Sequence, residues 1–230
     1  MNVMGIIFAN DALLGDLTSK RTMASLPFGG RYRQVDFALS NLMNAGATDV
    51  GVVLHGRYQS MLDHLGSGKD WDLSRKRGGL RLLPPFVAQQ GWGIMPFRGK
   101  VEALAGVRSY LEEIRQDYVV LMEGDLVVNL PLAEIQAEHV KSGADITVVC
   151  GNDSFATAGG SYFEVDKDGR VTEVLYNLNT PRGYRGLEVY VLSTKLLKEL
   201  VDECFAKDQY SWRRDVLRAK KDELKLNSYI

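Results

Sequence analysis

The amino-acid sequence predicts an α/β fold with a mostly parallel central sheet. Short apolar runs rich in β-branched residues alternate along the chain with segments of helical period, which is the order that βαβ units produce. The chain has 230 residues, of which 45% are hydrophobic. This length and composition suffice for one large domain with its own buried core.

The predicted strands are short and apolar enough to be buried on both faces, as in a parallel sheet. They are MGIIFA (residues 4–9), DVGVVL (49–54), YVVLM (118–122) and ADITVVC (144–150). Ligands of open parallel sheets bind at the carboxyl ends of the strands. The residues that follow Phe8, Leu54 and Met122 are therefore the positions where chemistry is expected.

Two apolar stripes between these strands predict helices. Each stripe has the spacing of three and four residues that marks one helical face. The first stripe ends at Gly46, and glycine commonly terminates helices. Its members are Val35, Leu39, Leu42 and Met43, and those of the second stripe are Leu104, Val107, Leu111 and Ile114.

The pattern changes from about residue 160. SYFEVDKDGRVTEVLYN (residues 161–177) predicts a hairpin that turns at Asp168 and Gly169, and GLEVYVLS (186–193) predicts another strand. A helix is expected to follow, with one face formed by Leu196, Leu197, Leu200, Val201 and Cys204.

Charge and composition exclude several partners. The net charge is −1 and the pI is about 6.3, so neither nucleic acid nor an anionic membrane is expected to bind. No apolar run approaches the ~18 residues that span a bilayer, and the N-terminus does not resemble a signal peptide. Cys150 and Cys204, the only cysteines, lie in apolar sequence and suit buried thiols in a reducing compartment. We expect a cytoplasmic protein.

The loop after the first strand is unusual for a nucleotide-binding protein. Glycine-rich turns let backbone N–H groups approach a phosphate. Residues 10–14 are instead Asn, Asp, Ala, Leu and Leu, and Gly15 is the one glycine that follows. An acidic side chain and two leucines repel or obstruct phosphate. Either the loop is an ordinary strand-to-helix connection or it marks the loss of a phosphate site.

Five motifs carry a resemblance to a known family. They are LPFGGRYRQVDFALSNLMNAGATDVGVV (residues 26–53), YQSMLDHLGSGKDWDL (58–73), GGLRLLPPF (78–86), FRGKVEALAGVRSYL (97–111) and YVVLMEGDLVVNL (118–130). Their order and spacing resemble those of the sugar-1-phosphate nucleotidyltransferases, and more narrowly of bacterial glucose-1-phosphate adenylyltransferase. In that family a sugar phosphate oxygen attacks the α-phosphorus of ATP and pyrophosphate leaves.

The resemblance implies a Rossmann-like, three-layer nucleotidyltransferase domain over residues 1–230, with a sugar-side subregion at about 155–192. A C-terminal left-handed β-helix, which the family carries, is absent from this sequence. A segment resembling GYWKDVGT, with the family's second metal carboxylate, is absent too. We therefore expect the chain to be part of a longer protein.

Three cations that the resemblance leads one to expect are missing. The family's arginine-bearing loop GGxGTRL corresponds to the NDALLG stretch, which has no arginine. Met23 stands at the lysine of an RAKPA motif, and Asn177 stands near the lysine of an EKP motif. Since removing one preorganised charge contact commonly lowers a rate by ~10² to 10³, the combined loss implies poor catalysis.

Part of the family's site is retained. The resemblance assigns Asp125, in EGD, as the remnant catalytic residue and ligand of Mg²⁺, with a helix or turn cap as its alternative role. It also implies that Gly99, Glu102 and Gly124 contact the nucleotide or sugar. One carboxylate rarely holds Mg²⁺ without substrate phosphates, so we expect weak binding and only with nucleotide present.

A retained frame without catalytic cations resembles the D-type regulatory subunit of glucose-1-phosphate adenylyltransferase. Such a chain would pair with a catalytic subunit in a tetramer. Lys20, Arg21 and Arg33 match family positions that contact small anionic effectors, and a solvated basic edge is their alternative role. Two other functions stay open: an active nucleotidyltransferase with replacement cations, and a non-enzymatic sensor of sugar phosphate or nucleotide that acts alone.

The remaining conspicuous side chains are interpreted as structural. His55, His64 and His139 have no carboxylate or cysteine at ligand spacing. The basic run at residues 75–77 favours a solvated loop over an anion site or interface. Trp71 and Trp212 favour packing over ligand contact, and the same holds for the tryptophan at position 92.

Overall fold

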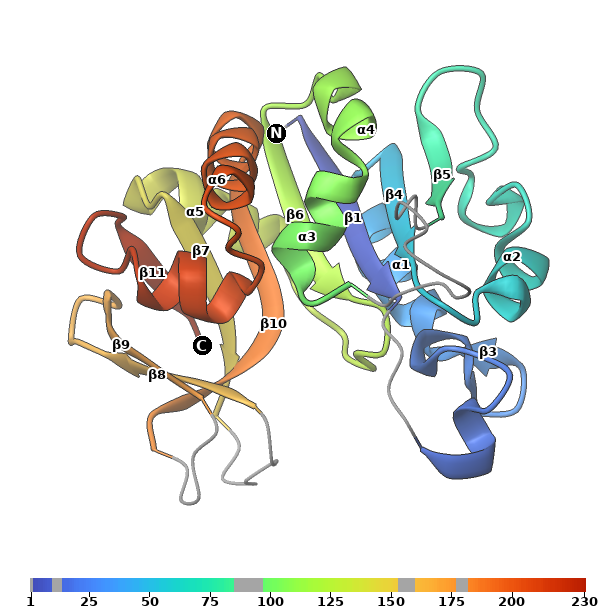
Figure 1. Cartoon of the computed structure of the whole chain (residues 1–230), viewed down its shortest axis with the longest axis horizontal. Coiled ribbons are helices and arrows are strands. Elements are labelled where there is room, and N and C mark those ends of the chain that lie inside the picture. Colours follow the sequence, from blue (N-terminus) through green and yellow to red (C-terminus); the bar gives the residue numbers. More distant parts are fainter. Residues whose placement is uncertain (1, 10–13, 85–96, 153–159, 177–181) are drawn as a thin grey trace.

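A mostly parallel sheet forms the middle of the protein (Figure 1). The structure, a computed structural model, describes residues 2–9, 14–84, 97–152, 160–176 and 182–230. The strand order is β11-β7-β10-β6-β1-β4-β5, in which β10 runs antiparallel to its neighbours β6 and β7. The strands are β1 (Val3–Ala9), β4 (Asp49–Leu54), β5 (Gly79–Leu83), β6 (Tyr118–Glu123), β7 (Ile146–Gly151), β10 (Tyr184–Ser193) and β11 (Leu226–Tyr229).

The side chains of β1 explain why both faces of the sheet are covered. All seven residues of this strand are buried, and alternate side chains point to opposite faces. Met4, Ile6 and Phe8 belong to one hydrophobic cluster, and Ile7 and Ala9 belong to the other. An apolar strand of this kind is stable only between two layers of helices, which gives the α/β fold of three layers that the sequence predicts.

The first helical layer covers the face toward the viewer in Figure 1. It contains α3 (Lys100–Gly106), α4 (Arg108–Glu113), α6 (Thr194–Ala206) and a π-helical segment at Trp212–Arg218. The helix α6 begins where the Ser193 hydroxyl accepts a hydrogen bond from the backbone N–H of Leu196 at 3.1 Å. Such an N-cap satisfies a donor that the first turn leaves free.

The second helical layer lies behind the sheet. It contains α1 (Gln34–Asn44), α2 (Gln59–Leu65) and α5 (Leu132–Ser142). Helix α1 buries Val35, Leu39 and Leu42 completely. It ends before Gly46, whose positive φ of 81° suits glycine.

Two hairpins extend this framework. The hairpin of β8 (Ser161–Val165) and β9 (Val171–Tyr176) joins the sheet through β10, and Gly169 in its turn has a φ of 82°. A shorter hairpin is made by β2 (Pro27–Phe28) and β3 (Tyr32–Arg33). Single-turn 3₁₀ helices occur at Gly15–Thr18, Met23–Ser25 and Lys69–Trp71.

The four predicted strands, the hairpin and the strand after it are confirmed, but one predicted helix is interrupted. The apolar stripe from Leu104 to Ile114 is divided between α3 and α4 at Val107, whose φ of −114° and ψ of 27° are not helical. Gly106 precedes the break and is a poor helix former, while the β-branched Val107 adds little helix propensity. Both short helices pack on the same side of the sheet, so the apolar residues of the stripe all still face the same hydrophobic cluster.

Asn41 joins α1 to the loop that follows β6. Its amide nitrogen donates to the carbonyl of Val128 at 2.7 Å, and its amide oxygen accepts from the N–H of Leu130 at 2.8 Å. The Asn41 side chain is buried, so it replaces water for two backbone groups of this loop. Because the loop starts directly after the end of β6, Asn41 helps to fix the residues at that edge of the sheet.

Replacing Asn41 with alanine should lower the free energy of unfolding by about 1 to 3 kcal/mol, since two half-buried backbone groups lose their partners. Urea unfolding followed by circular dichroism measures the change. Asn44→Ala, at an exposed position on the same helix, is the matched control and should have almost no effect. Equal effects of the two substitutions would refute the assigned role of Asn41.

Candidate functional site

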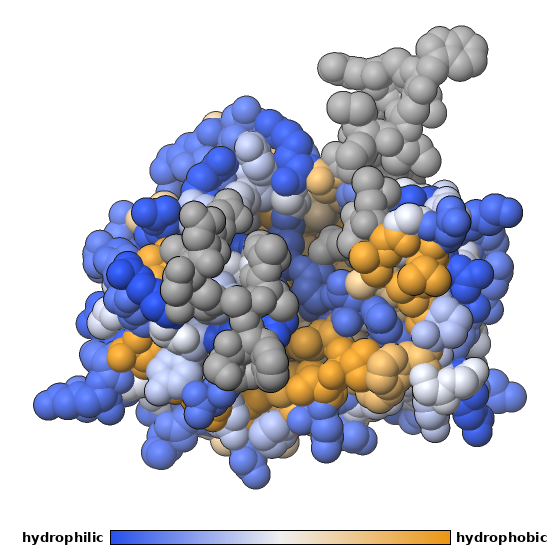
Figure 2. Space-filling view, turned by 90° about the horizontal axis from the view of Figure 1, so that it is seen from below, coloured by the Kyte–Doolittle hydropathy of each residue, from blue (hydrophilic) through white to orange (hydrophobic). Residues whose placement is uncertain are grey.

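The carboxyl ends of β1, β4 and β6 lie at one edge of the sheet. Figure 2 looks onto this edge and shows a hollow near its middle, with hydrophilic residues inside and apolar surface beside it. Ligands of open α/β sheets bind at such edges. The candidate site is therefore built from the residues that end these strands and from the elements that pack on them.

A largely buried lysine between two glutamates is the main feature of this edge. The Lys100 Nζ atom lies 2.7 Å from Glu123 Oε1 and 2.5 Å from Glu188 Oε2. The three side chains are only 10%, 13% and 16% exposed, respectively. The ammonium also lies 5.9 Å from the centre of the Phe8 ring and 5.7 Å from that of Tyr190. Two carboxylates and two aromatic faces thus stabilise one positive charge.

Each member of this triad comes from a different element. Lys100 is the first residue of α3, Glu123 is the last residue of β6, and Glu188 lies within β10. The antiparallel register places Tyr190 opposite Leu121, so the two glutamates lie near one another on neighbouring strands. Like charges on paired strands destabilise a sheet unless a cation lies between them, and Lys100 supplies it.

The backbone at Glu188 adopts a conformation that is rare for this residue type. Its φ is 56°, and the pairing of β10 with β7 shifts register between Gly186 and Val189. A bulge of this kind redirects a side chain, and a non-glycine residue at positive φ is costly. The strain is offset by the contacts that the redirected carboxylate makes.

Those contacts occupy both carboxylate oxygens of Glu188. The Ser161 hydroxyl donates to Oε1 at 2.6 Å, and Arg213 Nε lies 3.5 Å from the same oxygen. The Tyr190 hydroxyl donates to Oε2 at 3.0 Å, next to Lys100. Glu188 therefore connects β8, β10, α3 and the π-helical segment.

The protonation states follow from these contacts. Burial alone would lower the pKa of Lys100, but the charges and hydrogen bonds of Glu123 and Glu188 raise it, so the ammonium stays charged. Burial raises the pKa of Glu123 to about 6, and Lys100 opposes this shift. Burial also acts to raise the pKa of Glu188, but Lys100 and Arg213 outweigh it and lower the pKa to about 2.

Asp125 lies two residues after the end of β6 and is half-buried. Burial raises its pKa, while Lys100 lowers and Glu188 raises it by charge, so Asp125 belongs to the same electrostatic cluster. Gly124 is held by its N–H, which donates to the Phe8 carbonyl at 2.9 Å. A Cβ atom there would lie 2.9 Å from the Cβ of Ala24, so close packing requires glycine.

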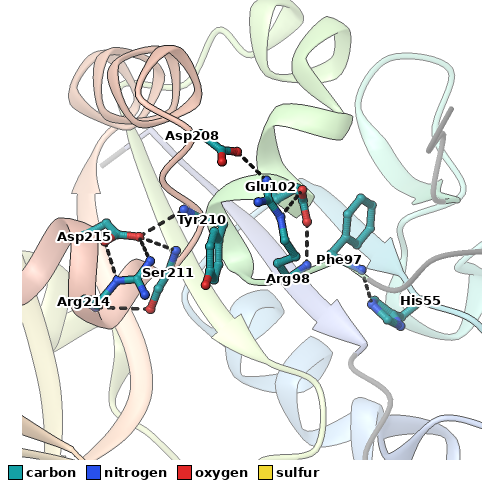
Figure 3. Close-up of polar contacts among 9 residues, drawn as sticks. All are labelled: His55, Phe97, Arg98, Glu102, Asp208, Tyr210, Ser211, Arg214 and Asp215. Atoms are coloured by element: carbon teal, nitrogen blue, oxygen red, sulfur yellow. Dashed lines mark hydrogen bonds and ion pairs between the residues drawn. The ribbon is translucent and has the colours of Figure 1, made fainter. Parts of the chain in front are cut away.

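The other predicted ligand residues face a second network, drawn in Figure 3. The Glu102 carboxylate accepts from the backbone N–H of Arg98 at 2.5 Å and from its Nε at 2.9 Å. Arg98 also binds Asp208 at 2.8 Å and lies over the Tyr210 ring. A Cβ atom on Gly99 would lie 2.3 Å from the Tyr210 carbonyl oxygen. Gly99 and Glu102 thus attach the start of α3 to the segment after α6.

Figure 3 shows that the Tyr210 ring lies between two arginines. Arg98 and Arg214 each lie 4.7 Å from the ring centre. Arg214 in turn pairs with Asp215, whose carboxylate accepts from the N–H groups of Tyr210 and Ser211. This network fixes the entry to α3 and hence the position of Lys100.

The predicted effector cations are only partly brought together. Lys20 and Arg21 line a shallow pocket with Leu17, Leu26 and Asp16. The Arg33 guanidinium is close enough to Arg21 for the charge of Arg21 to lower its pKa, after the larger effect of burial. It donates to the Ser60 carbonyl and hydroxyl, so Arg33 also has a structural role.

Some of the positions where the resemblance leads us to expect a cation lie outside the described part of the chain. Residues 10–13 and 177 fall outside it, as does the tryptophan at position 92. Leu14 is exposed, and Met23 begins a 3₁₀ turn.

The histidines and cysteines make structural contacts. His64 Nε2 lies 2.6 Å from Asp36 Oδ1, and His139 Nδ1 lies 2.8 Å from Thr147 Oγ1. His55 accepts a hydrogen bond from the backbone N–H of Phe97 at 3.0 Å. Cys150 and Cys204 are buried free thiols, as predicted. Within the described ranges, no three His, Cys, Asp or Glu side chains converge to hold a metal ion.

The sequence interpretation missed the triad. Two signals were available: Glu188 is an isolated acidic residue in the strand-like run GLEVYVLS, and Glu123 ends the apolar run YVVLM. A charge in a buried strand requires a partner. The partner is Lys100, which lies beside a predicted helix. The apolar spacing of that helix does not distinguish Lys100 from any other charged residue.

A mostly parallel, doubly covered sheet with charged residues at its carboxyl edge belongs to the class of α/β proteins that bind ligands there. Within this class the chain is a member of the nucleotidyl transferase family, whose sequence profile matches residues 13–225. Among the described residues, no helix is long and apolar enough to cross a membrane.

The chain is similar to enzymes named glucose-1-phosphate adenylyltransferase. It is 31% identical over 224 residues to that of Thermotoga neapolitana, which covers 94% of this chain and 52% of the relative. It is 31% identical over 194 residues to that of Clostridium acetobutylicum, covering 83% and 50%. It is 36% identical over 137 residues to that of Halalkalibacterium halodurans, covering 59% and 35%. The chain spans about half the length of the first two.

Replacing Glu188 with glutamine should lower the free energy of unfolding by about 3 kcal/mol at neutral pH, because Lys100 loses a buried charge partner. The folded pKa of Glu188 is about 2 against an ordinary 4.5, so its contribution is complete above that ordinary value and is lost as pH falls toward 2. The stability difference between wild type and variant should therefore shrink as the pH falls from about 5 to about 2.

Urea unfolding at several pH values measures this difference. Glu199→Gln is the control, because Glu199 is exposed and its Lys195 partner is 3.9 Å away. This control should change stability by less than about 0.5 kcal/mol. A Glu188→Gln effect that is independent of pH would contradict the assigned charge on Glu188.

Proposed function

We propose that this protein is a regulatory, catalytically weak subunit of a glucose-1-phosphate adenylyltransferase. The reaction of that enzyme joins ATP and glucose-1-phosphate to give ADP-glucose and pyrophosphate, as a step of glycogen synthesis. The family membership and the similarity to enzymes of this name support the reaction class. The regulatory role is supported by the state of the site.

The observation that carries the proposal is the commitment of Lys100. A nucleotidyltransferase must hold a polyphosphate at the carboxyl edge of its sheet, and it stabilises the charge that develops there with cations. In this protein the Lys100 ammonium at that edge is already bound to two carboxylates. Its charge is neutralised by protein groups, and a phosphate would have to compete with them.

The sequence adds to this observation. The resemblance places Met23 at one lysine of the active family members and Asn177 near another. The loop at residues 10–14 offers one acidic and two leucine side chains in place of an arginine. Together these features support weak catalysis more strongly than either does alone, although losses of this kind are not additive.

A subunit that keeps its fold but catalyses weakly can still regulate a catalytic subunit with which it assembles. In the part of the chain that the structure describes, two hydrophobic clusters of buried side chains cover the two faces of the sheet. We therefore propose that the partner is a catalytic glucose-1-phosphate adenylyltransferase subunit in a hetero-oligomer. Mg²⁺ would bind weakly, and only when a nucleotide supplies phosphate ligands beside Asp125.

The purified full-length protein, assayed alone with ATP, glucose-1-phosphate and Mg²⁺, should release pyrophosphate far more slowly than ~1 per second, the lower end of typical enzyme turnover. Mixed with a catalytic subunit, it should change the response of that subunit to effectors. Turnover above ~1 per second by the chain alone would show an active enzyme. Failure to associate with a catalytic subunit would favour a sensor that acts alone.

Lys20 and Arg21 are the candidate contacts for an anionic effector. Lys20 and Arg21 are exposed or half-buried cations beside one shallow pocket, a place where a phosphate group would gain charge-assisted hydrogen bonds. Arg33 is left unchanged in the test because its bonds to Ser60 give it a structural role. Lys20→Ala with Arg21→Ala, in this chain alone, should raise the half-effective concentration of a phosphorylated sugar by on the order of tenfold in the mixed complex.

The matched control is Lys76→Ala with Arg77→Ala. These two cations line a different pocket with Asp49 and Gln116, near the amino ends of β4 and β6. The control should leave the effector response unchanged. If both double variants respond like the wild type and assemble normally, Lys20 and Arg21 form a solvated basic edge.

A further inference from the structure

The position of the Lys100 ammonium has a consequence for metal binding. Its nitrogen lies within 2.7 Å of carboxylate oxygens from Glu123 and Glu188. A divalent cation bound to these two carboxylates would have to use the same oxygens, because Mg²⁺ binds carboxylates at about 2.0–2.1 Å. The ammonium and a metal ion therefore exclude one another, by space and by charge.

The free chain does not fit a divalent ion at this place. In the part of the chain that the structure describes, no group of three acidic, histidine or cysteine side chains is arranged to hold a metal. Asp125 lies two residues after the end of β6, and the charges of Lys100 and Glu188 both act on its pKa. The carboxylates of Glu123 and Glu188 both lie within 2.7 Å of the Lys100 nitrogen, which balances their negative charge from within the protein.

We propose that Lys100 is a built-in counterion that takes the place of a divalent metal ion between Glu123 and Glu188 in the free chain. Removing the ammonium should let this pair of carboxylates take up a divalent cation in its place. This inference goes beyond the proposed function, because it concerns which cation lies between Glu123 and Glu188, called here the acidic centre. It requires neither substrate nor partner subunit.

The surroundings of the triad favour this role over that of an incidental ion pair. Glu188 keeps a left-handed backbone conformation that places its carboxylate against Lys100. The Phe8 and Tyr190 rings both face the ammonium, which suits a compact cation. Ser161 and Tyr190 hold the Glu188 carboxylate in place by hydrogen bonds. The two carboxylates are thus held in fixed positions around one cation that has lost most of its water. A bound metal ion would need the same arrangement of carboxylates, with the ion in place of the ammonium.

The test measures metal binding directly, with Mn²⁺ as a paramagnetic substitute for Mg²⁺ and without nucleotide. Electron paramagnetic resonance of free Mn²⁺ is followed during titration of the wild type and of Lys100→Met, which keeps the length of the side chain but not its charge. The wild type should bind no Mn²⁺ in the millimolar range. Lys100→Met should bind one ion at least on the order of tenfold more tightly, since two buried carboxylates lose their cation.

Lys220→Met is the matched control. The Lys220 side chain is 13% exposed, so it is about as buried as that of Lys100, and it pairs with Glu203 at 2.8 Å. It lies away from Glu123 and Glu188. It should gain no Mn²⁺ site. Lys100→Arg, which keeps the positive charge, should also gain none.

Two results would overturn the proposal. One is Mn²⁺ binding by the wild type at this centre, shown by loss of that binding in Glu123→Gln. The other is a folded Lys100→Met variant that binds Mn²⁺ no better than the wild type. If Lys100→Met does not fold without metal, the proposal requires that Mn²⁺ restore its circular dichroism spectrum, and failure of that rescue counts against it. Enzyme activity enters none of these measurements, so a wrong assignment of function would leave the result unaffected.

Discussion

The buried ion pair of Lys100 with Glu123 and Glu188 is the interaction on which the candidate site depends. It joins α3, β6 and β10 at the edge where a parallel sheet presents its ligand site. Buried charges are expensive to desolvate, and a hydrophobic replacement of a whole ion pair often costs nothing. The presence of the pair at this edge is therefore better explained by its effect on the charge of the site than by its contribution to stability. It fixes one cation among several carboxylates.

This constraint connects the fold with the proposed function. The sheet and its two helical layers form the frame of a nucleotidyl transferase, and the network of Arg98, Glu102 and Tyr210 fixes the start of α3. Asn41 fixes the loop after β6 from the other side of the sheet. Both supports act on the carboxyl edge. There the charges are balanced within the protein, which favours a subunit that keeps its shape and binds partners or effectors over one that transfers a nucleotidyl group rapidly.

The sequence predicts the sheet because buried parallel strands appear as continuous apolar runs such as 49–54 and 118–122. It predicts less where that signal is weak: β5 contains Arg81, β11 has only four residues, and Gly106 interrupts a helical stripe that continues through the break. The triad could not be predicted from spacing, because its members are far apart in the chain and meet only through strand register and a bulge at Glu188. The resemblance named Glu102 as a ligand contact, but only the tertiary structure shows that its carboxylate binds Arg98.

The most direct test of the account is a crystal structure of the wild-type protein grown or soaked with Mn²⁺, with anomalous diffraction data collected at the manganese edge. The account predicts no anomalous peak between Glu123, Asp125 and Glu188, and density for the Lys100 ammonium within hydrogen-bond distance of both glutamates. An anomalous peak at that position, with the Lys100 side chain displaced from the two carboxylates, would contradict it.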